Sequence, residues 1–179
     1  MFFMIFLCRK KINLEYVIGE IYMILDVKQL INIDEKILDH ITKWMYDWWG
    51  KSDGYSYEET KCYMKYSMQK DKLPKTYGLF LDNEIIGIYQ FTNVNLIVRP
   101  DIYPWLANVY IDEKYRHKGY GRKLLETVKN TAKDIKNCEE IFLWTEFKGL
   151  YEKFGWSFIS DIDTYNKDSR IQRLYKLSL

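Results

Sequence analysis

Apolar residues recur every three or four positions in a long early section of the chain, a spacing that predicts amphipathic helices. Asp34 is expected to cap a first helix that runs to about Trp49, because its side chain can accept a hydrogen bond from a free amide at the helix start. Ser56 is expected to cap a second helix, and Glu59 completes a capping box. The preceding segment 23–30 is apolar and β-branched, which predicts a strand.

Beyond Pro74 the pattern becomes that of strands. The expected strands span residues 76–81, 84–92, 105–111, 140–145, 156–162 and 171–177, with Asp82-Asn83 as a hairpin turn. A helix with a strong apolar stripe follows residue 121, and a short helix is expected at 149–154. The strand–helix–strand unit 105–145 is long enough for a parallel crossover. The pattern predicts a single α/β domain with a mixed, mostly antiparallel sheet, one parallel strand pair and flanking helices.

The domain is expected to span residues 23–179, which leaves residues 1–22 as a leader. The apolar run Met1–Cys8 is too short to span a bilayer, which needs about 20 residues. Basic residues follow this run, whereas in a secretory signal they precede it. Two interpretations stay open: an extra strand or helix packed on the domain, or a stretch upstream of a true start at Met23.

The amino-acid composition argues against several classes of protein. The chain has 27 Lys and Arg against 25 Asp and Glu, a net charge of +2, so nucleic acid is not an expected partner. A membrane is not expected either, because the apolar run at the start is too short to span one. Its 3 cysteines are far apart and odd in number, and its 2 histidines lie near none of them. A disulfide framework and a structural metal are therefore not expected. A reducing, cytoplasmic location is expected. The expected oligomeric state is a monomer or a homodimer.

A basic, glycine-bearing loop lies between the strand 105–111 and the amphipathic helix that follows. It reads Arg116-His117-Lys118-Gly119-Tyr120-Gly121, with Arg122 next. The first amides of a helix lack partners and carry the positive end of its dipole, so they bind anions. Glycines let the backbone approach a phosphate, and the basic side chains add charge. The loop predicts a phosphate site, but a dinucleotide fold is disfavoured, because Leu124 replaces the third glycine and too little chain remains for more parallel units.

At this loop the chain resembles the GNAT superfamily of N-acetyltransferases, over roughly residues 23–179. The six residues from Arg116 to Gly121 match the family's Gln/Arg-x-x-Gly-x-Gly/Ala motif. The segment Leu150-Tyr151-Glu152-Lys153-Phe154-Gly155-Trp156 is similar to the family's Tyr-x-x-x-Gly-Phe segment. The resemblance implies an enzyme that transfers an acetyl group from acetyl-CoA to an amine, by direct attack in a ternary complex, without a metal.

The resemblance also implies roles for particular residues. The amides of residues 116–121 would hold the pyrophosphate, and the strand before them would pair with the pantetheine arm like an added strand. The strands at 108–111 and 141–144 would splay and open a wedge for that arm. Tyr151 would stand beside the thioester sulfur as the general acid. The implied coenzyme contacts are Val109, Tyr110, Ile111, Arg116, His117, Lys118, Gly119, Tyr120, Gly121 and Arg122.

An amine acceptor requires a base, since a lysine-like ammonium has a pKa of about 10.4. Some family members carry a carboxylate on the strand before the phosphate loop, but the segment 104–108 has none. Glu146, just after the strand 140–145, is the expected base, with Asp101 or a water relay as alternatives. By family analogy the two early helices cover the acceptor, and carboxylates and aromatic faces near their turn suit a cationic amine. These residues are Asp47, Trp48, Trp49 and Tyr55.

The acceptor itself stays open among aminoglycosides, small amines, and peptide or protein amines. Two other functions also stay open. One is a module that binds acyl-CoA without turnover, against which Tyr151 argues. The other is a nucleic-acid-binding or interaction protein that uses the basic loop, against which the near-neutral net charge of +2 argues.

Overall fold

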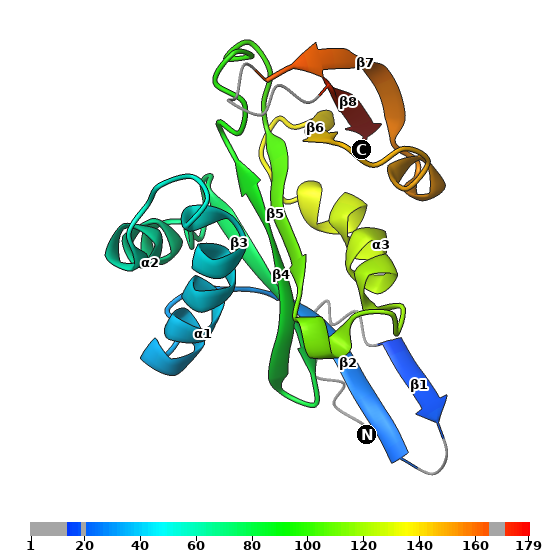
Figure 1. Ribbon diagram of the computed structural model, residues 1–179. Helices are drawn as coiled ribbons and strands as arrows, with labels where there is room; N and C mark the ends of the chain where they lie inside the picture. The colour runs from blue at the N-terminus through cyan, green and yellow to red at the C-terminus, as the bar shows by residue number, and fades with distance from the viewer. Residues whose placement is uncertain (1–13, 19–20, 165–170) are drawn as a thin grey trace, which may run out of the picture.

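One eight-stranded sheet organises the molecule (Figure 1). The computed structural model describes residues 14–18, 21–164 and 171–179. The strands are β1 (Leu14–Ile18), β2 (Ile21–Gln29), β3 (Lys75–Leu81), β4 (Glu84–Thr92), β5 (Trp105–Ile111), β6 (Glu140–Thr145), β7 (Ser157–Asp163) and β8 (Ile171–Ser178). They lie in the order β1-β2-β3-β4-β5-β6-β8-β7, and β5–β6 is a parallel pair among otherwise antiparallel neighbours. The predicted mixed α/β fold with one parallel pair is confirmed.

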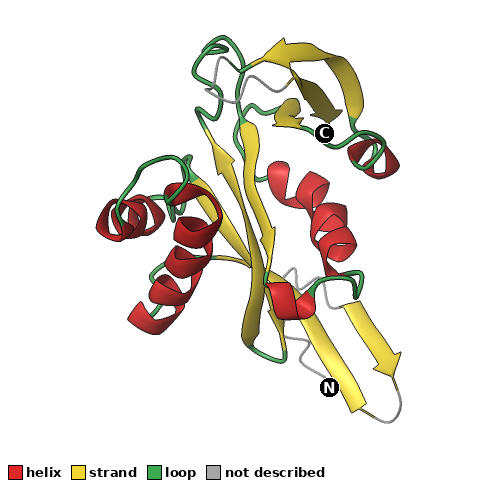
Figure 2. Ribbon diagram, viewed as in Figure 1, coloured by secondary structure: helices red, strands yellow, loops and turns green. Residues whose placement is uncertain are grey.

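Helices cover both faces of this sheet (Figure 2). They are α1 (Glu35–Met45), a π-helical turn (Tyr46–Gly50), α2 (Tyr57–Tyr66), α3 (Tyr120–Ala132), and two 3-10 turns (Glu113–Tyr115 and Tyr151–Phe154). α1 and α2 lie on one face and α3 on the other. Successive side chains of a strand point to opposite faces, so β4 serves both cores. Ile88 packs in the cluster under α1 and α2, whereas Tyr89 packs in the cluster under α3.

The predicted caps fix where α1 and α2 begin. Asp34 accepts a hydrogen bond from the Ile37 amide at 2.8 Å. Ser56 Oγ accepts from the Glu59 amide at 3.1 Å, and the Glu59 carboxylate accepts from the Ser56 amide at 2.7 Å. Each such cap contributes about 1 kcal/mol, so local sequence alone is enough to place both helix starts.

The end of the first helix differs from the prediction. α1 is regular only to Met45, and the π-helical turn Tyr46–Gly50 continues it. In that turn the Lys51 amide donates to the Tyr46 carbonyl at 2.9 Å. A π turn shifts the direction of the side chains that follow and occurs often at functional sites. Here it presents Trp48 at the surface, 48% exposed.

The hairpin between β3 and β4 turns at Asp82-Asn83, as predicted. Their φ angles are 49° and 71°, the positive values of a two-residue type I′ turn. Asp82 Oδ1 also accepts a hydrogen bond from the Ile24 amide at 2.9 Å, which ties the turn to β2.

The leader contributes a strand to the sheet. β1 pairs antiparallel with β2, and β2 begins at Ile21, two residues before the predicted start at residue 23. Among the described residues β1 has β2 as its one neighbour, at the edge farthest from β7. A domain boundary at residue 23 stays a prediction.

A chain that starts at Met23 is expected to fold. It keeps the pairs from Leu25 to Gln29 with β3 and the buried Leu25 side chain, and it loses an edge strand. We expect its melting temperature to fall by no more than about 5 °C, the effect of about 1–2 kcal/mol in a domain of this size. Thermal unfolding followed by circular dichroism compares the two chains. An unfolded shortened chain beside a folded full chain would make the leader a structural part of the domain.

Candidate active site

β5 and β6 part soon after they begin. Trp105 is in register with Phe142, and the Phe142 amide donates to the Pro104 carbonyl at 2.9 Å. From there β5 stays paired with β4 as far as Ile111, whereas β6 stays paired with β8 as far as Thr145. The two strands therefore diverge into a wedge, the splay that the resemblance implied. The edge of β5 that faces this wedge has no strand partner among the described residues, so it can pair with an extended ligand.

A bulge marks the point where β5 leaves β6. The register of β4 with β5 shifts between Ile88 and Gln90, and Asn108 has a φ of 52°. Asn tolerates this left-handed region better than most residues. A bulge bends its strand and redirects side chains. Tyr110 consequently packs with α1, whereas Val109 packs with the cluster under α3.

The glycine loop leads directly into α3. Gly119 caps this helix with a φ of 84°, the region that favours glycine, and no side chain caps it. A Cβ at Gly119 would meet no atom within 4 Å, so the space beside the helix start is open. A Cβ at Gly121 would lie 3.8 Å from Ile111 of β5. The uncapped first amides of α3, with the positive end of the helix dipole, suit a phosphate group.

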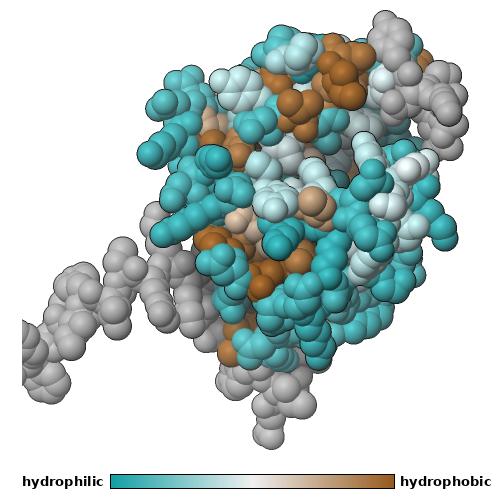
Figure 3. Space-filling view, turned by 90° about the vertical axis from the view of Figure 1, so that its left-hand side faces the viewer, coloured by the Kyte–Doolittle hydropathy of each residue, from teal (hydrophilic) through white to brown (hydrophobic). Residues whose placement is uncertain are grey.

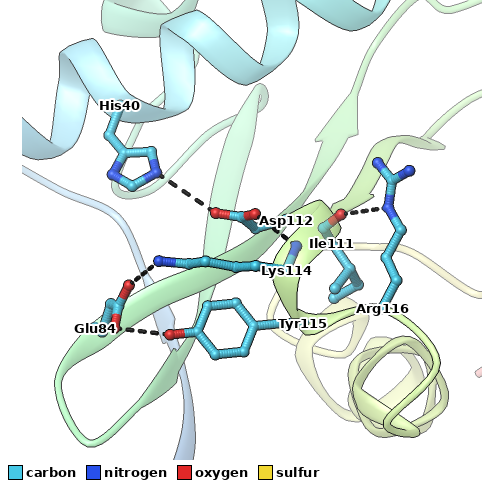
Figure 4. Close-up of polar contacts among 7 residues, drawn as sticks. All are labelled: His40, Glu84, Ile111, Asp112, Lys114, Tyr115 and Arg116. Carbon is cyan, nitrogen blue, oxygen red and sulfur yellow. Dashed lines mark hydrogen bonds and ion pairs between the residues drawn. The ribbon is translucent and has the colours of Figure 1, made fainter.

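Polar contacts hold the backbone that leads into this loop (Figure 4). Glu84, at the start of β4, accepts hydrogen bonds from Lys114 Nζ at 2.6 Å and from the Tyr115 hydroxyl at 2.8 Å. These two groups, Lys114 first, lower the pKa of the Glu84 carboxyl. Asp112 accepts from the Lys114 amide at 3.1 Å and lies 3.8 Å from His40 Nε2. These contacts fix the backbone that leads into the loop.

Arg116 connects the loop to the face that α1 covers. Its Nε donates to the Ile111 carbonyl at 2.9 Å, and its guanidinium points away from α3 (Figure 4). The guanidinium carbon lies 4.7 Å from the ring centre of Trp48 and 5.1 Å from that of Tyr110. Arg116 Nη1 also lies 3.5 Å from the Glu113 carboxylate, so aromatic faces and one carboxylate hold its charge in this structure.

The other residues of the loop differ in their burial. His117 and Lys118 are exposed, and His117 has a φ of 61°. Tyr120 is half-buried against the core under α3. Arg122 is exposed and bonds to Glu126 on the next turn of the helix at 2.9 Å.

Tyr151 lies shortly after β6, on the 3-10 turn Tyr151–Phe154. The sequence predicted a short helix over 149–154, which starts two residues earlier. It is 9% exposed and packs against the rings of Trp156 and Tyr175, at 6.0 and 6.2 Å between centroids. Burial raises the pKa of its hydroxyl to about 12. The hydroxyl is therefore protonated at neutral pH. It has no hydrogen-bond partner among the described residues, so its hydrogen is available to donate.

The two carboxylates considered as a base have different surroundings. Glu146 is exposed in the loop that follows β6. Asp101 accepts two hydrogen bonds from Arg99, at 2.8 and 2.7 Å, and this contact lowers the pKa of its carboxyl. A lowered pKa makes Asp101 a weaker base, whereas the role of Glu146 stays a prediction.

Aromatic rings gather where α1 and its π turn meet β5. Trp44, Trp48 and Trp49 each lie 5.4 to 6.4 Å from the ring of Tyr110. A groove of about 310 Å³ opens here, lined by Trp44, Asp47, Trp48, Tyr110, Asp112 and Glu113 among others. Of the predicted acceptor residues, three lie together at this groove or beside it, and the exposed Tyr55 lies farther along the connection to α2. Figure 3 shows the side of the molecule on which α1 and α2 lie, where pale and brown side chains are interspersed with hydrophilic ones.

A buried polar cluster beside the wedge was missed by the sequence reasoning. Gln90 on β4 is 0% exposed and bonds to Thr76, Asn108 and Tyr63. The signal for this cluster in the sequence was a single amide side chain in each of two mostly apolar strands, Gln90 in β4 and Asn108 in β5. Only the register of β4 with β5, together with the position of α2, brings these residues together.

A second cavity, of about 680 Å³, lies at the opposite end of β5. Its lining includes Lys75 at the start of β3, Tyr103 just before β5, and Cys138 before β6. It is therefore separate from the glycine loop, which follows the other end of β5.

Comparisons with known proteins agree with this geometry. The family model described as "Acetyltransferase (GNAT) family" matches residues 38–156. The spermine/spermidine N(1)-acetyltransferase of Bacillus subtilis (strain 168) is 26% identical over 114 residues, which cover 56% of this chain and 70% of that protein. The probable spermine N(1)-acetyltransferase of Bacillus subtilis subsp. natto (strain BEST195) is 25% identical with the same coverage.

Solved structures share the fold at low sequence identity. An aminoglycoside 6'-N-acetyltransferase complexed with coenzyme A has a TM-score of 0.65 and 11% identity, over 85% of this chain and 96% of that one. A ribosomal alpha-N-protein acetyltransferase in complex with coenzyme A has a TM-score of 0.64 and 15% identity, over 87% and 94%. In both structures the coenzyme is bound to a protein with the fold described above.

Within the described ranges, no group of three or more His, Cys, Asp or Glu side chains is arranged to hold a metal ion. Over the same residues, no helix has the length and apolar character needed to cross a membrane.

Proposed function

Because the chain belongs to the acetyltransferase (GNAT) family, we propose that it is an N-acetyltransferase that moves an acetyl group from acetyl-CoA to an amine in a ternary complex. The observation that carries the proposal is the wedge between β5 and β6, with the uncapped start of α3 following β5. An extended arm that ends in a phosphate fits both features at once, because one offers a free strand edge and the other offers free amides.

Acetyl-CoA, the expected cosubstrate, agrees with the family and with the solved relatives that hold coenzyme A. In the proposed complex the amides at the start of α3 bind the pyrophosphate. The backbone of Val109 to Ile111 pairs with the pantetheine arm. Lys118 and Arg122 flank the segment 119–121 in the sequence and are exposed, so in this complex their side chains supply positive charge to the phosphates.

The proposed reaction is a direct displacement at the thioester carbonyl carbon. The neutral amine nitrogen forms the new C–N bond, the C–S bond breaks, and the amine gives up one proton to a base, for which Glu146 remains our candidate. The departing thiolate, whose thiol has a pKa of about 8.5, is stabilised by the hydrogen of the Tyr151 hydroxyl and takes that proton as the C–S bond breaks, and the tyrosinate then regains a proton from the solvent. The high pKa of Tyr151, about 12, keeps that proton in place until the sulfur leaves.

For the acceptor we propose a small cationic amine of the polyamine type. The groove at α1 combines aromatic faces with the carboxylates Asp47, Asp112 and Glu113, and cations are attracted to both. Arg116 already places a guanidinium over Trp48 there, so these rings accept a positive charge in this structure. The curated relatives named for spermine and spermidine support the same class.

The proposal also includes the location of the protein and its partners. Cys62 and Cys138 are free thiols, which supports a reducing, cytoplasmic location. The net charge of +2 supports the absence of a nucleic-acid partner. Monomer and homodimer both remain compatible with the fold.

The function is tested by release of free thiol from acetyl-CoA in the presence of spermidine, butylamine, kanamycin or a peptide with a free N-terminus. We expect release with spermidine above all. Asp47→Asn is expected to raise the KM for spermidine about 5-fold, because it removes a carboxylate and leaves Lys43 without its partner. The KM for acetyl-CoA should not change. Binding of acetyl-CoA without thiol release with any of these amines would favour a non-catalytic acyl-CoA-binding module.

A further inference from the structure

Lys75 is a buried lysine at the start of β3. It is 5% exposed, and among the described residues its side chain makes no hydrogen bond or ion pair. An ammonium group carries a charge and three hydrogen-bond donors, and proteins that bury such a group normally pair it. Lys75 therefore presents donors for which the described part of the chain supplies no acceptor.

The side chain of Lys75 lies on the face of the sheet that α3 covers. Alternate residues of a strand share a face, and Tyr77 and Leu79 both pack in the cluster under α3. Lys75 is also in register with Phe91 of β4, which belongs to the same cluster. The ammonium is therefore on the opposite face from α1, α2 and the acceptor groove.

Lys75 lines the cavity of about 680 Å³ at the start of β5. Sites for small molecules usually measure about 300–1,000 Å³ and combine apolar walls with a few polar groups. The apolar walls of this cavity come from the segment before β3, the start of β5, the segment after α3, and β6. Their side chains are Leu73, Pro104, Ile135 and Phe142.

The other charged groups of the cavity are weaker determinants than Lys75. Four of them are exposed, two of each sign: Asp71, Lys72, Lys136 and Glu139. Water and salt screen exposed charges, so these groups attract a ligand only weakly. Glu140 accepts a hydrogen bond from Lys176 Nζ at 2.6 Å, which compensates its charge. The buried ammonium of Lys75 therefore decides which charge the cavity prefers.

We propose that this cavity binds a small organic carboxylate with an apolar body, and that Lys75 holds the carboxylate group. The carboxylate oxygens accept charge-assisted hydrogen bonds from the Lys75 ammonium and supply its missing partner. The hydrocarbon part of the ligand packs against walls such as Leu73 and Phe142, which removes apolar surface from water. An inorganic anion satisfies the charge alone and leaves these walls uncovered. The site goes beyond the proposed acetyl transfer, since the glycine loop follows the other end of β5.

Titration calorimetry of the full chain tests the ligand class with benzoate and 4-methylpentanoate, two carboxylates that differ in their apolar bodies. We expect both to bind with dissociation constants below about 1 mM. Benzamide has the shape of benzoate without its charge, so it should bind at least about 10-fold more weakly. Failure of both carboxylates to bind, equal binding of benzamide and benzoate, or binding of inorganic phosphate in place of the carboxylates would each overturn the inference.

Lys75→Met tests the role of the ammonium, because methionine keeps the apolar stem and removes the charge. We expect it to weaken benzoate binding by about 10-fold or more. Without ligand, its melting temperature should equal or exceed that of wild type, since the substitution removes an unpaired buried charge. Lys129→Met is the control, because Lys129 is exposed on α3 and lies outside the cavity lining. Its affinity for benzoate should stay within about 2-fold of wild type.

The variants separate this inference from the proposed function. If Lys75→Met binds benzoate as tightly as wild type does, the inference is wrong. A Lys75→Met chain that unfolds, or melts well below wild type without ligand, shows that Lys75 is paired within the fold, and this also overturns the inference. A wild type that acetylates no amine overturns the proposed function and leaves this inference standing, because dependence on Lys75 assigns the benzoate binding to this cavity.

Discussion

Replacing Tyr151 with Phe is expected to lower kcat by roughly 10- to 1,000-fold with acetyl-CoA and an active amine. The substitution removes one oxygen from a side chain that is 9% exposed and packed between aromatic rings, so the core keeps its volume. The loss should appear in kcat, because the hydroxyl acts on the sulfur as the C–S bond breaks. The effect stays toward the low end of this range if the thiolate leaves well by itself.

The environment of Tyr151 also predicts a pH dependence. Burial raises the pKa of its hydroxyl to about 12, so the acid form persists through neutral and moderately alkaline pH. Wild-type kcat should therefore show no alkaline fall from this group until the pH approaches about 12. If kcat falls at a lower pH, and the same fall occurs in Tyr151→Phe, the ionisation responsible belongs to another group.

Tyr175 provides a matched control for Tyr151. It lies in ring contact with Tyr151, is fully buried, and donates its hydroxyl to Glu152 at 2.8 Å. Tyr175→Phe is expected to lower the melting temperature by about 2–4 °C, the effect of about 1 kcal/mol for one lost hydrogen bond. Its kcat should stay near that of wild type. A Tyr151→Phe enzyme that keeps the wild-type rate, with chemistry shown to limit that rate, would exclude Tyr151 as the acid.

Local sequence was enough to predict most of the fold. Caps such as Asp34 and Ser56, and the turn Asp82-Asn83, act over a few residues, so their effect is visible in one stretch of sequence. The parallel pair followed from the length of the connection between β5 and β6. The π turn after Met45 was missed, because a π turn and a regular helix share the same apolar spacing over so few residues.

The candidate site was predicted less completely, because it depends on contacts between distant segments. The glycine loop carries its own signature in the chain, and the structure places it at the start of α3 as expected. The cluster at Gln90 has no such signature. Gln90 and Asn108 meet through strand register, and Tyr63 joins them from α2. Arg116 was expected to add charge beside the phosphates, and this stays a prediction; in the structure its guanidinium lies over the ring of Trp48 on the π turn after α1.

Substituting Gly119 with Asp is expected to weaken acetyl-CoA binding by about 100-fold. At a concentration of 100 times the dissociation constant, the coenzyme stabilises the wild type by about 2.7 kcal/mol. In a domain of this size that corresponds to a rise in melting temperature of roughly 5–10 °C. The same concentration should raise the melting temperature of Gly119→Asp by about 1 °C.

The reason lies in the space and charge at the start of α3. Gly119 has a φ of 84°, a conformation that Asp adopts more readily than most residues, and a Cβ there meets no atom within 4 Å. The variant should therefore fold. Its carboxylate would, however, stand where the pyrophosphate is expected to approach the free amides, and it would also cap those amides itself.

Gly119→Asn is the matched control, because it has the same shape and the same tolerance of positive φ without the charge. It isolates the effect of the side chain's volume, so its acetyl-CoA shift should lie between those of wild type and Gly119→Asp. Thermal unfolding of the three proteins without coenzyme checks that the substitutions leave the fold intact. Equal shifts in all three would remove the loop from the coenzyme site, and equal losses in both variants would show that backbone approach, and not charge, is what Gly119 provides.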